Sequence, residues 1–323
     1  MTWFPSPYPD ELFYSVLCRY YLSSGIKEHN IVKRLLFGNR VGIKMATLYP
    51  NAAVHAVLSQ LPEGVFDGHN VILHHTPFLY YARMYPQQER EALLDDLLQG
   101  RGKTPTHLWK TFPKDDYALR YCPLCIQEDT KIYGEPYYHV EHQIPLSSVC
   151  VRHRCRLKQI AVDNPRLALN NNFYPLGTVE TAREPDMDVT PAELRVSELV
   201  WEYWKLPASI SPPACNNLYQ TLLNSGYRTI VRQTGLNVDR AKLYAALCDY
   251  HGAETVAKGF GASITTSMMN RIKTWEQLLP DRYILIQTML DLPTNTVFDP
   301  KPIRDKLREK IGRMAGQGGF HTL

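Results

Sequence analysis

Long apolar runs are missing from this 323-residue sequence. No stretch approaches the roughly 18 apolar residues that a membrane-spanning helix needs. The N-terminus, Met1 to Pro5, also lacks the basic and apolar segments of a secretory signal, so we expect neither a leader nor a membrane span. A large excess of one charge is missing too, since the formal net charge is +4 and the pI is about 8.6. That balance permits a nucleic-acid partner without requiring one.

The signatures of common enzyme classes are absent as well. The sequence contains no G-x-x-x-x-G-K-[ST] phosphate loop, no G-x-G-x-x-G after a strand and no G-x-S-x-G nucleophile elbow. Acidic residues are scattered, without the clustering expected of a two-metal nuclease. We therefore predict a protein that acts by binding macromolecules and has no catalytic residue.

What the sequence does contain is the periodicity of a mostly helical protein. Apolar residues recur every three or four positions in many short segments, and Pro77 is expected to end an element over residues 70–75. The predicted N-terminal helices cover residues 8–24, 31–37, 52–61 and 87–98. The predicted C-terminal helices cover residues 191–206, 217–224, 239–250, 254–258 and 282–290.

The domain organisation follows from changes in this texture, and the length allows two or three hydrophobic cores. We expect an N-terminal domain of short helices, a metal-binding module with short strands, a connector rich in proline and asparagine, and a C-terminal helical domain. These cover residues 1–115, 116–160, 161–190 and 191–323, respectively. Within the module, alternation over residues 137–144 predicts a strand.

The strongest local motif is a set of four metal donors, Cys122, Cys125, Cys150 and His153. They form C-x2-C-x24-C-x2-H, in which each pair presents two donors on one tight turn. Two such pairs close a tetrahedron around Zn²⁺ and leave no position for water, so the sequence predicts one structural zinc ion. Cys155 is an alternative fourth ligand in place of His153, although His153 completes the paired spacing.

The remaining cysteines and histidines predict no second centre. Seven cysteines, an odd number clustered mainly between residues 122 and 155, do not form a disulfide framework and favour a reducing cytoplasm. Cys18, Cys215 and Cys248 are expected to be packed thiols. His139-Val140-Glu141 resembles the H-x-E of zinc deaminases, but here the C-x-x-C comes before it rather than after it. We expect His139 and His142 to hydrogen-bond or pack beside the metal centre.

Two segments are candidates for binding nucleic acid. Residues 254–274 have the outline of a helix, a glycine-containing turn and a second helix carrying Arg271 and Lys273, although two ordinary packed helices explain the pattern equally well. The other candidate is the basic run over residues 301–313, which is either a solvated face or a phosphate-binding surface. Its candidate contacts are Lys301, Arg304, Lys306 and Arg308.

Several of these motifs together resemble the TniQ/TnsD family of transposon target-selection proteins. The central motifs are Arg120 to Cys125, Tyr133 to Tyr137, His142 to Pro145 and Cys150 to His153. The opening segment, Phe4 to Ser15 with Arg19, is similar to the N-terminal signature of that family. Residues 243–252 and 282–287 are similar to its C-terminal helical region, more loosely. Together these motifs span most of the chain.

The resemblance implies a helical protein with a helix-turn-helix-like N-terminal part and zinc-finger modules. It also implies a non-catalytic adaptor that couples a target-recognition complex to the AAA+ ATPase regulator of transposition. The recognition device is either an RNA-guided CRISPR effector complex, with its guide RNA and target DNA, or the DNA-binding region of a TnsD-like protein itself. The short length favours the first, TniQ-type role. A homodimer and a prokaryotic, cytoplasmic, nucleoid-associated location are further expectations.

The sequence departs from the family pattern in two places. Arg154-Cys155 follows the C-x2-H motif where a simpler His-Gly continuation is expected. No second cysteine pair follows residue 155 at finger-like spacing, so only one zinc site is expected.

Overall fold

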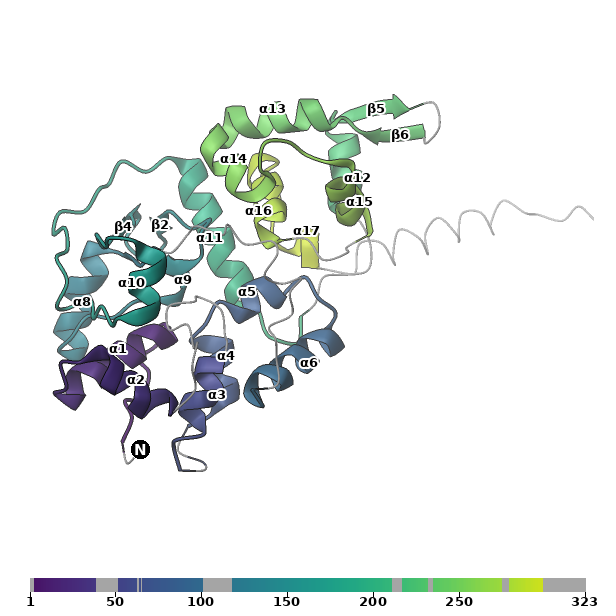
Figure 1. The fold of residues 1–323 in the computed structure, drawn as a ribbon. Helices are drawn as coiled ribbons and strands as arrows, with labels where there is room; N and C mark the ends of the chain where they lie inside the picture. The colour runs from purple at the N-terminus through teal and green to yellow at the C-terminus, as the bar shows by residue number, and fades with distance from the viewer. Residues whose placement is uncertain are drawn as a thin grey trace, which may run out of the picture.

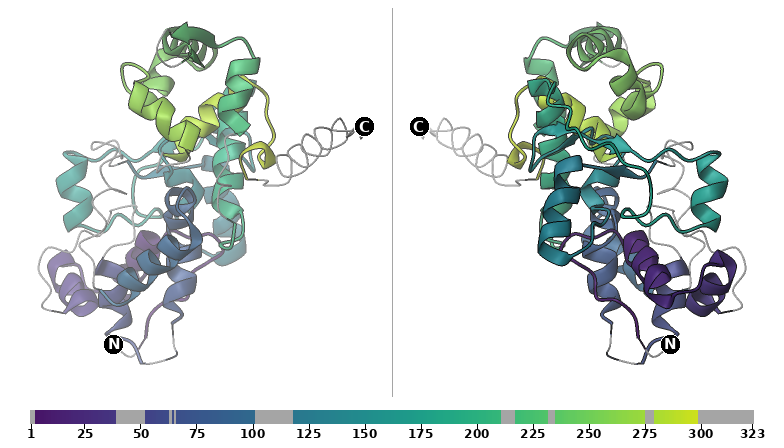
Figure 2. Two further views of the ribbon diagram at one scale, coloured as in Figure 1. Left: turned by 90° about the vertical axis from the view of Figure 1, so that its right-hand side faces the viewer. Right: turned by 90° about the vertical axis from the view of Figure 1, so that its left-hand side faces the viewer.

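A computed structural model describes residues 3–38, 52–62, 64, 66–100, 118–210, 217–231, 235–274 and 279–298. The fold is mostly helical, as predicted, with α11 running between the N-terminal and C-terminal groups of helices (Figure 1). The C-terminal helices lie at the opposite end of the molecule from the N-terminus (Figure 2). Among the described residues, no helix is both long and apolar enough to cross a lipid bilayer.

The elements fall into three groups along the chain. The N-terminal helices are α1 (Phe13–Ser24), α2 (His29–Phe37), α3 (Ala52–Leu58), α4 (Gly68–His74), α5 (Phe78–Ala82) and α6 (Gln87–Leu98). The central elements are β1 (Arg120–Tyr121), α8 (Pro123–Tyr133), α9 (Val140–Gln143), β2 (Val149–Cys150), β3 (Cys155–Arg156), β4 (Lys158–Gln159) and α10 (Pro165–Asn171). The C-terminal elements are α11 (Pro191–Lys205), α12 (Asn217–Asn224), β5 (Arg228–Val231), β6 (Gly235–Val238), α13 (Arg240–His251), α14 (Ala253–Phe260), α15 (Thr266–Thr274), α16 (Pro280–Met289) and α17 (Asn295–Phe298).

The first helix begins five residues later than the periodicity predicts. Residues 8–12 pair instead with the central part of the chain, where the Leu12 N–H donates to the Tyr138 carbonyl at 2.7 Å. Val140 N–H donates in turn to the Asp10 carbonyl at 2.9 Å. These bonds hold the backbone before Phe13 out of the helical conformation. The predicted break at Pro77 is confirmed, because α4 ends at His74 and α5 begins directly after that proline.

The predicted strand over residues 137–144 is wrong. This segment contains the single helical turn α9, and only His139 forms an isolated bridge, to Glu11. The Gln143 side chain takes the place of a pairing strand, since its amide donates to the Arg120 carbonyl and accepts from the Arg120 N–H, at 2.8 and 2.9 Å. Val140 and Ile144 are both fully buried, four residues apart, as a helical turn requires.

The strands form three separate antiparallel pairs, β1 with β4, β2 with β3 and β5 with β6. The second pair aligns Cys150 with Cys155. The β5–β6 hairpin was not predicted, although Thr229, Ile230 and Val231 are β-branched residues of the kind that favours strands. Helix α10 lies inside the segment that was expected to be a connector, and Leu169 on it is buried.

Helix α11 packs against both groups of helices. Thr190 and Glu193 form a capping box at its start, with Pro191 in the first turn as predicted. Its buried face contacts α5 and β2 on one side and α13 and α16 on the other. At its end, the fully buried Arg83 donates to the carbonyls of Tyr203, Leu206, Pro207 and Ile210. Apart from a small cluster of cysteines, most of the described buried apolar residues form one continuous core from Phe4 to Phe298.

Candidate metal centre

Two tight turns carry the four predicted donors. Cys122 is the N-cap of α8, where its sulfur accepts a hydrogen bond from the Cys125 N–H at 3.4 Å, and Pro123 occupies the first helical turn. Cys150 ends β2, and the turn that follows places His153 opposite α8. Arg154 closes that turn with a φ of 51°, a left-handed conformation that brings the chain back into β3.

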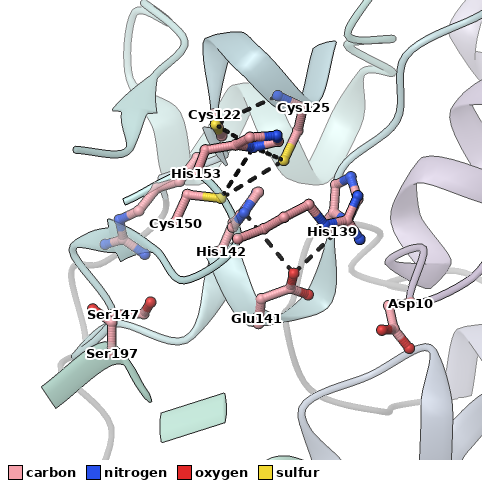
Figure 3. A network of polar contacts seen from close by, with 12 residues as sticks. Asp10, Cys122, Cys125, His139, Glu141, His142, Ser147, Cys150, His153 and Ser197 are labelled. Atoms are coloured by element: carbon pink, nitrogen blue, oxygen red, sulfur yellow. Dashed lines mark hydrogen bonds and ion pairs between the residues drawn. The ribbon is translucent and has the colours of Figure 1, made fainter. Parts of the chain in front are cut away.

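The donor atoms of Cys122, Cys125, Cys150 and His153 all lie within 4.8 Å of one another (Figure 3). His153 Nδ1 is 3.5, 3.3 and 3.6 Å from the sulfurs of Cys122, Cys125 and Cys150, and the Cys125 and Cys150 sulfurs are 3.7 Å apart. A tetrahedral zinc site with ordinary bond lengths separates two sulfurs by about 3.8 Å, and a sulfur from a nitrogen by about 3.6 Å. The four side chains therefore form a Cys3His cluster that could hold one metal ion.

Cys155, the alternative ligand, lies beside this group without joining it. Its sulfur is 3.4 Å from that of Cys122, but the set whose donors are all mutually close contains His153. The three cysteines of that set are buried, whereas His153 is 20% exposed. The arrangement favours His153 as fourth donor, with Cys155 packed behind Cys122.

Protonation of the thiols is linked to their contacts with one another. Hydrogen bonds from Cys125 and Cys150 lower the pKa of the Cys122 thiol, and its contact with Cys122 raises the pKa of Cys125. A cation that binds thiolates would replace the protons shared among these sulfurs. On the outer side, His153 Nε2 lies 3.5 Å from Glu128, which also pairs with Arg152 at 2.9 Å. A carboxylate behind a ligating imidazole orients the ring.

His139 and His142 are buried beside the cluster and outside its donor set (Figure 3). His139 Nε2 lies 2.8 Å from an Asp129 carboxylate oxygen. Burial lowers the pKa of His139, but the Asp129 hydrogen bond and the nearby Glu141 outweigh it and raise that pKa above the ordinary value. Burial and the His139 charge hold the pKa of His142 well below its ordinary value. We interpret both rings as packed supports of the centre.

The N-terminal signature lies against the C-terminal end of α8, a contact that the sequence analysis missed. Arg19 donates to Glu11 at 2.9 Å and to Glu135 at 2.7 Å, and its guanidinium lies 3.6 Å from the centre of the Tyr8 ring. Tyr8 in turn packs on Tyr133. Both motifs were identified separately, but nothing in their spacing along the chain indicated that they touch. We name these five residues the Arg19 clamp.

Of the candidate nucleic-acid contacts, only Arg271 is fully described, and it lies on α15, outside the donor set of the metal centre. Arg271 is exposed on α15, and Lys273 belongs to the same helix, although its side chain is not described. Lys301, Arg304, Lys306 and Arg308 lie outside the described residues, as does Cys215.

Comparison with known proteins identifies the N-terminal half of the chain. The model of the TniQ family matches residues 2–157, a range that contains the Arg19 clamp and all four donors. The transposition protein TnsD of transposon Tn7 from Escherichia coli is 27% identical over 183 residues. That alignment covers 55% of this chain and 35% of TnsD, so the chain matches about a third of its relative. Through residues 2–157, the chain belongs to the TniQ family of TnsD-related proteins.

Proposed function

We propose that the protein is a non-catalytic target-selection factor in DNA transposition, with one structural Zn²⁺ held by Cys122, Cys125, Cys150 and His153. The observation that carries this proposal is the TniQ match over residues 2–157, which includes the complete donor set. Four protein donors leave no open coordination position, as is typical of structural rather than catalytic zinc. The ion would cross-link α8 to the β2–β3 turn.

The contacts around the centre support a role in docking a protein partner. The Arg19 clamp ties α1 to the end of α8, and α8 begins at two of the zinc ligands. The zinc module and the N-terminal helices therefore form one body, whose shape depends on the metal. We propose that this body couples an RNA-guided CRISPR effector complex to the AAA+ ATPase regulator of transposition.

Co-purification tests the adaptor function. We expect the tagged full-length chain to retain a purified AAA+ regulator or CRISPR effector from the same transposon, and Cys122→Ser with Cys150→Ser to abolish that retention together with the bound zinc. Cys248→Ser, at a half-buried thiol outside the centre, is the matched control. Failure of the wild-type chain to retain either partner contradicts the adaptor function. A zinc-free double variant that folds and binds normally contradicts the role of the metal.

A second candidate function is direct reading of the target DNA. The name of the relative TnsD, a transposition protein, is compatible with this function. Its specific support is α15, whose Thr266, Ser267, Asn270 and Arg271 are all exposed while Met269 and Ile272 are buried. Selection of bound duplexes from a random pool tests it. Enrichment of one sequence supports direct reading, and a pool that stays random after repeated selection contradicts it.

A further inference from the structure

A cleft of about 850 Å³ lies between the β5–β6 hairpin and α15. Thr229 and Asn237, which face each other across the hairpin, line one wall, and Thr266 and Asn270 of α15 line the opposite wall. Arg240, the first residue of α13, lies on the lining between them. The hairpin extends from the N-terminal end of α13, above α12 and α15 (Figure 1).

A sharp turn joins α14 to α15, the helix that lines this cleft. Helix α14 ends at Phe260, and its C-cap Gly261 has a φ of 70° and a ψ of −149°, a combination that residues other than glycine rarely adopt. Helix α15 begins after Thr265, whose hydroxyl accepts from the Met268 N–H at 3.2 Å. Val256 and Phe260 of α14 and Ile272 of α15 are all buried in the main core, where α14 packs on α13 and α16 and α15 packs on α12. Two short helices held in this way present the outer face of the second one to a partner.

That outer face carries side chains of types that can form hydrogen bonds with base edges. Thr266, Ser267, Asn270 and Arg271 occupy one side of α15, and all four are exposed. Asparagine can bond bidentately to adenine and arginine to guanine in the major groove of duplex DNA.

Charge is distributed unevenly along this part of the molecule. Arg228, Arg240 and Lys242 are exposed at the hairpin end of α13, and none forms an ion pair with a described carboxylate. Among the described residues that line the cleft, Asp239 is the only acidic one, and its carboxylate caps α13 by accepting from the Lys242 N–H. On the next helix, α14, Lys258 instead lies 4.0 Å from a carboxylate oxygen of Glu254. A surface of unpaired cations around hydrogen-bonding side chains is complementary to a nucleic-acid backbone.

We propose that duplex DNA docks on this surface with α15 in the major groove and one phosphate strand in the cleft, against the base of the β5–β6 hairpin. Thr266, Ser267, Asn270 and Arg271 then contact base edges, while Arg228, Arg240 and Lys242 contact phosphates. Phosphate contacts set the position of a protein on DNA, and base contacts provide the specificity. The inference rests on the second candidate function, direct DNA reading, and adds the hairpin as a separate backbone-binding element.

Fluorescence anisotropy with a labelled short duplex of random sequence tests the hairpin contacts in the full-length chain. The variant combines Arg228→Gln, Arg240→Gln and Lys242→Gln, and its matched control is Lys131→Gln, which removes an exposed cation from α8. Loss of three phosphate contacts should weaken binding on the order of tenfold or more, and should reduce the slope of log affinity against log salt by about three. Asn270→Ala should leave that slope unchanged and weaken binding to a selected sequence more than to a random one.

The outcomes separate the two proposals. If the triple variant keeps the affinity and salt slope of the Lys131→Gln control while Asn270→Ala loses sequence preference, the hairpin contacts are wrong and direct reading stands. If the wild-type chain binds no duplex even at low salt, both are wrong. Circular dichroism establishes that each variant is folded. Arg240→Lys keeps the charge and should therefore keep the wild-type slope of log affinity against log salt.

Discussion

The Cys3His centre and the α13–α16 region are held together by different interactions. The centre is a small cluster of its own, and Leu124 and Leu157 are the apolar side chains of the described part of the chain that pack against its cysteines. The α13–α16 region instead packs through the main apolar core. Its buried residues include Leu243, Leu247, Val256, Phe260, Tyr283, Ile284 and Leu285. Because the centre has so little apolar area, we expect it to depend on the proposed zinc ion for its stability, whereas the apolar core stabilises the C-terminal helices.

The charged side chains of the two regions also differ in whether they form ion pairs with other residues of the chain. Around the metal centre they pair internally, through Arg19 with Glu11 and Glu135 and through Arg152 with Glu128. Near the hairpin, Arg228 and Arg240 are exposed without a described carboxylate partner. Ion pairs within the chain hold its elements in place. Exposed charges without such a partner can instead attract a ligand of opposite charge. This difference agrees with the structural role proposed for the first region and with the DNA contact proposed for the second.

The largest expected effect is loss of the metal. Replacing Cys150 by serine should unfold residues 118–160, because apparent zinc-binding energies of small modules are about 10–16 kcal/mol and are coupled to folding. Helices α13 and α16 should stay protected. Hydrogen exchange read peptide by peptide measures both regions in one sample, with Cys248→Ser as the control. Uniform loss of protection along the whole chain would contradict the expected difference in stability between the two regions.

Removal of the Arg83 side chain tests the junction between the two regions. Arg83→Met leaves the carbonyls at the end of α11 without their donor, in a place where Arg83 is fully buried. We expect a loss of about 3 kcal/mol in the free energy of unfolding, given 1–3 kcal/mol for each buried acceptor that stays unsatisfied. Urea denaturation measures it. Arg195→Met, which removes a half-buried, ion-paired arginine of α11, should cost less than about 1 kcal/mol.

The Arg19 clamp predicts a dependence of stability on pH. Burial raises the pKa of Glu11 to about 7 even though Arg19 and the Tyr8 N–H favour the charged form. A carboxyl group whose pKa is higher in the folded state stabilises the protein below its unfolded pKa, near 4.5, and loses that contribution as the pH rises toward 7. Relative to Glu11→Gln, the wild type should therefore lose about 3 kcal/mol over this interval. Parallel stability curves for the two proteins would contradict the assignment.

The smallest expected effect is in the turn before α15. Gly261→Ala places a side chain at a positive φ, which should cost about 1–3 kcal/mol. A Cβ at this position meets no atom within 4 Å, so backbone conformation alone sets the cost. Thermal denaturation measures it, and Ala262→Gly, at the next position of the same turn, is the control. A cost above about 3 kcal/mol would show that the turn is more constrained than its φ indicates.

Local patterns predicted much of the fold. Helix α6 has the predicted bounds, and α11 begins at the proline that was expected to start it, because capping and periodicity act within a few residues. The strand expected over residues 137–144 failed because alternation assumes one wet face, while Tyr138, His139 and Val140 are all buried. The β5–β6 hairpin was missed because its strands are only four residues each.

The sequence by itself predicted the four side chains that the structure brings together as the Cys3His cluster, since ligand pairs on tight turns are local and their chemistry is specific to cysteine and histidine. It also determined the family, through short motifs that are read without their contacts. Only the tertiary structure decided that Arg19 reaches Glu135 and that Thr229 faces α15 across a cleft. Those contacts join residues far apart in the chain, and burial and long-range packing select them in a way that no local period records.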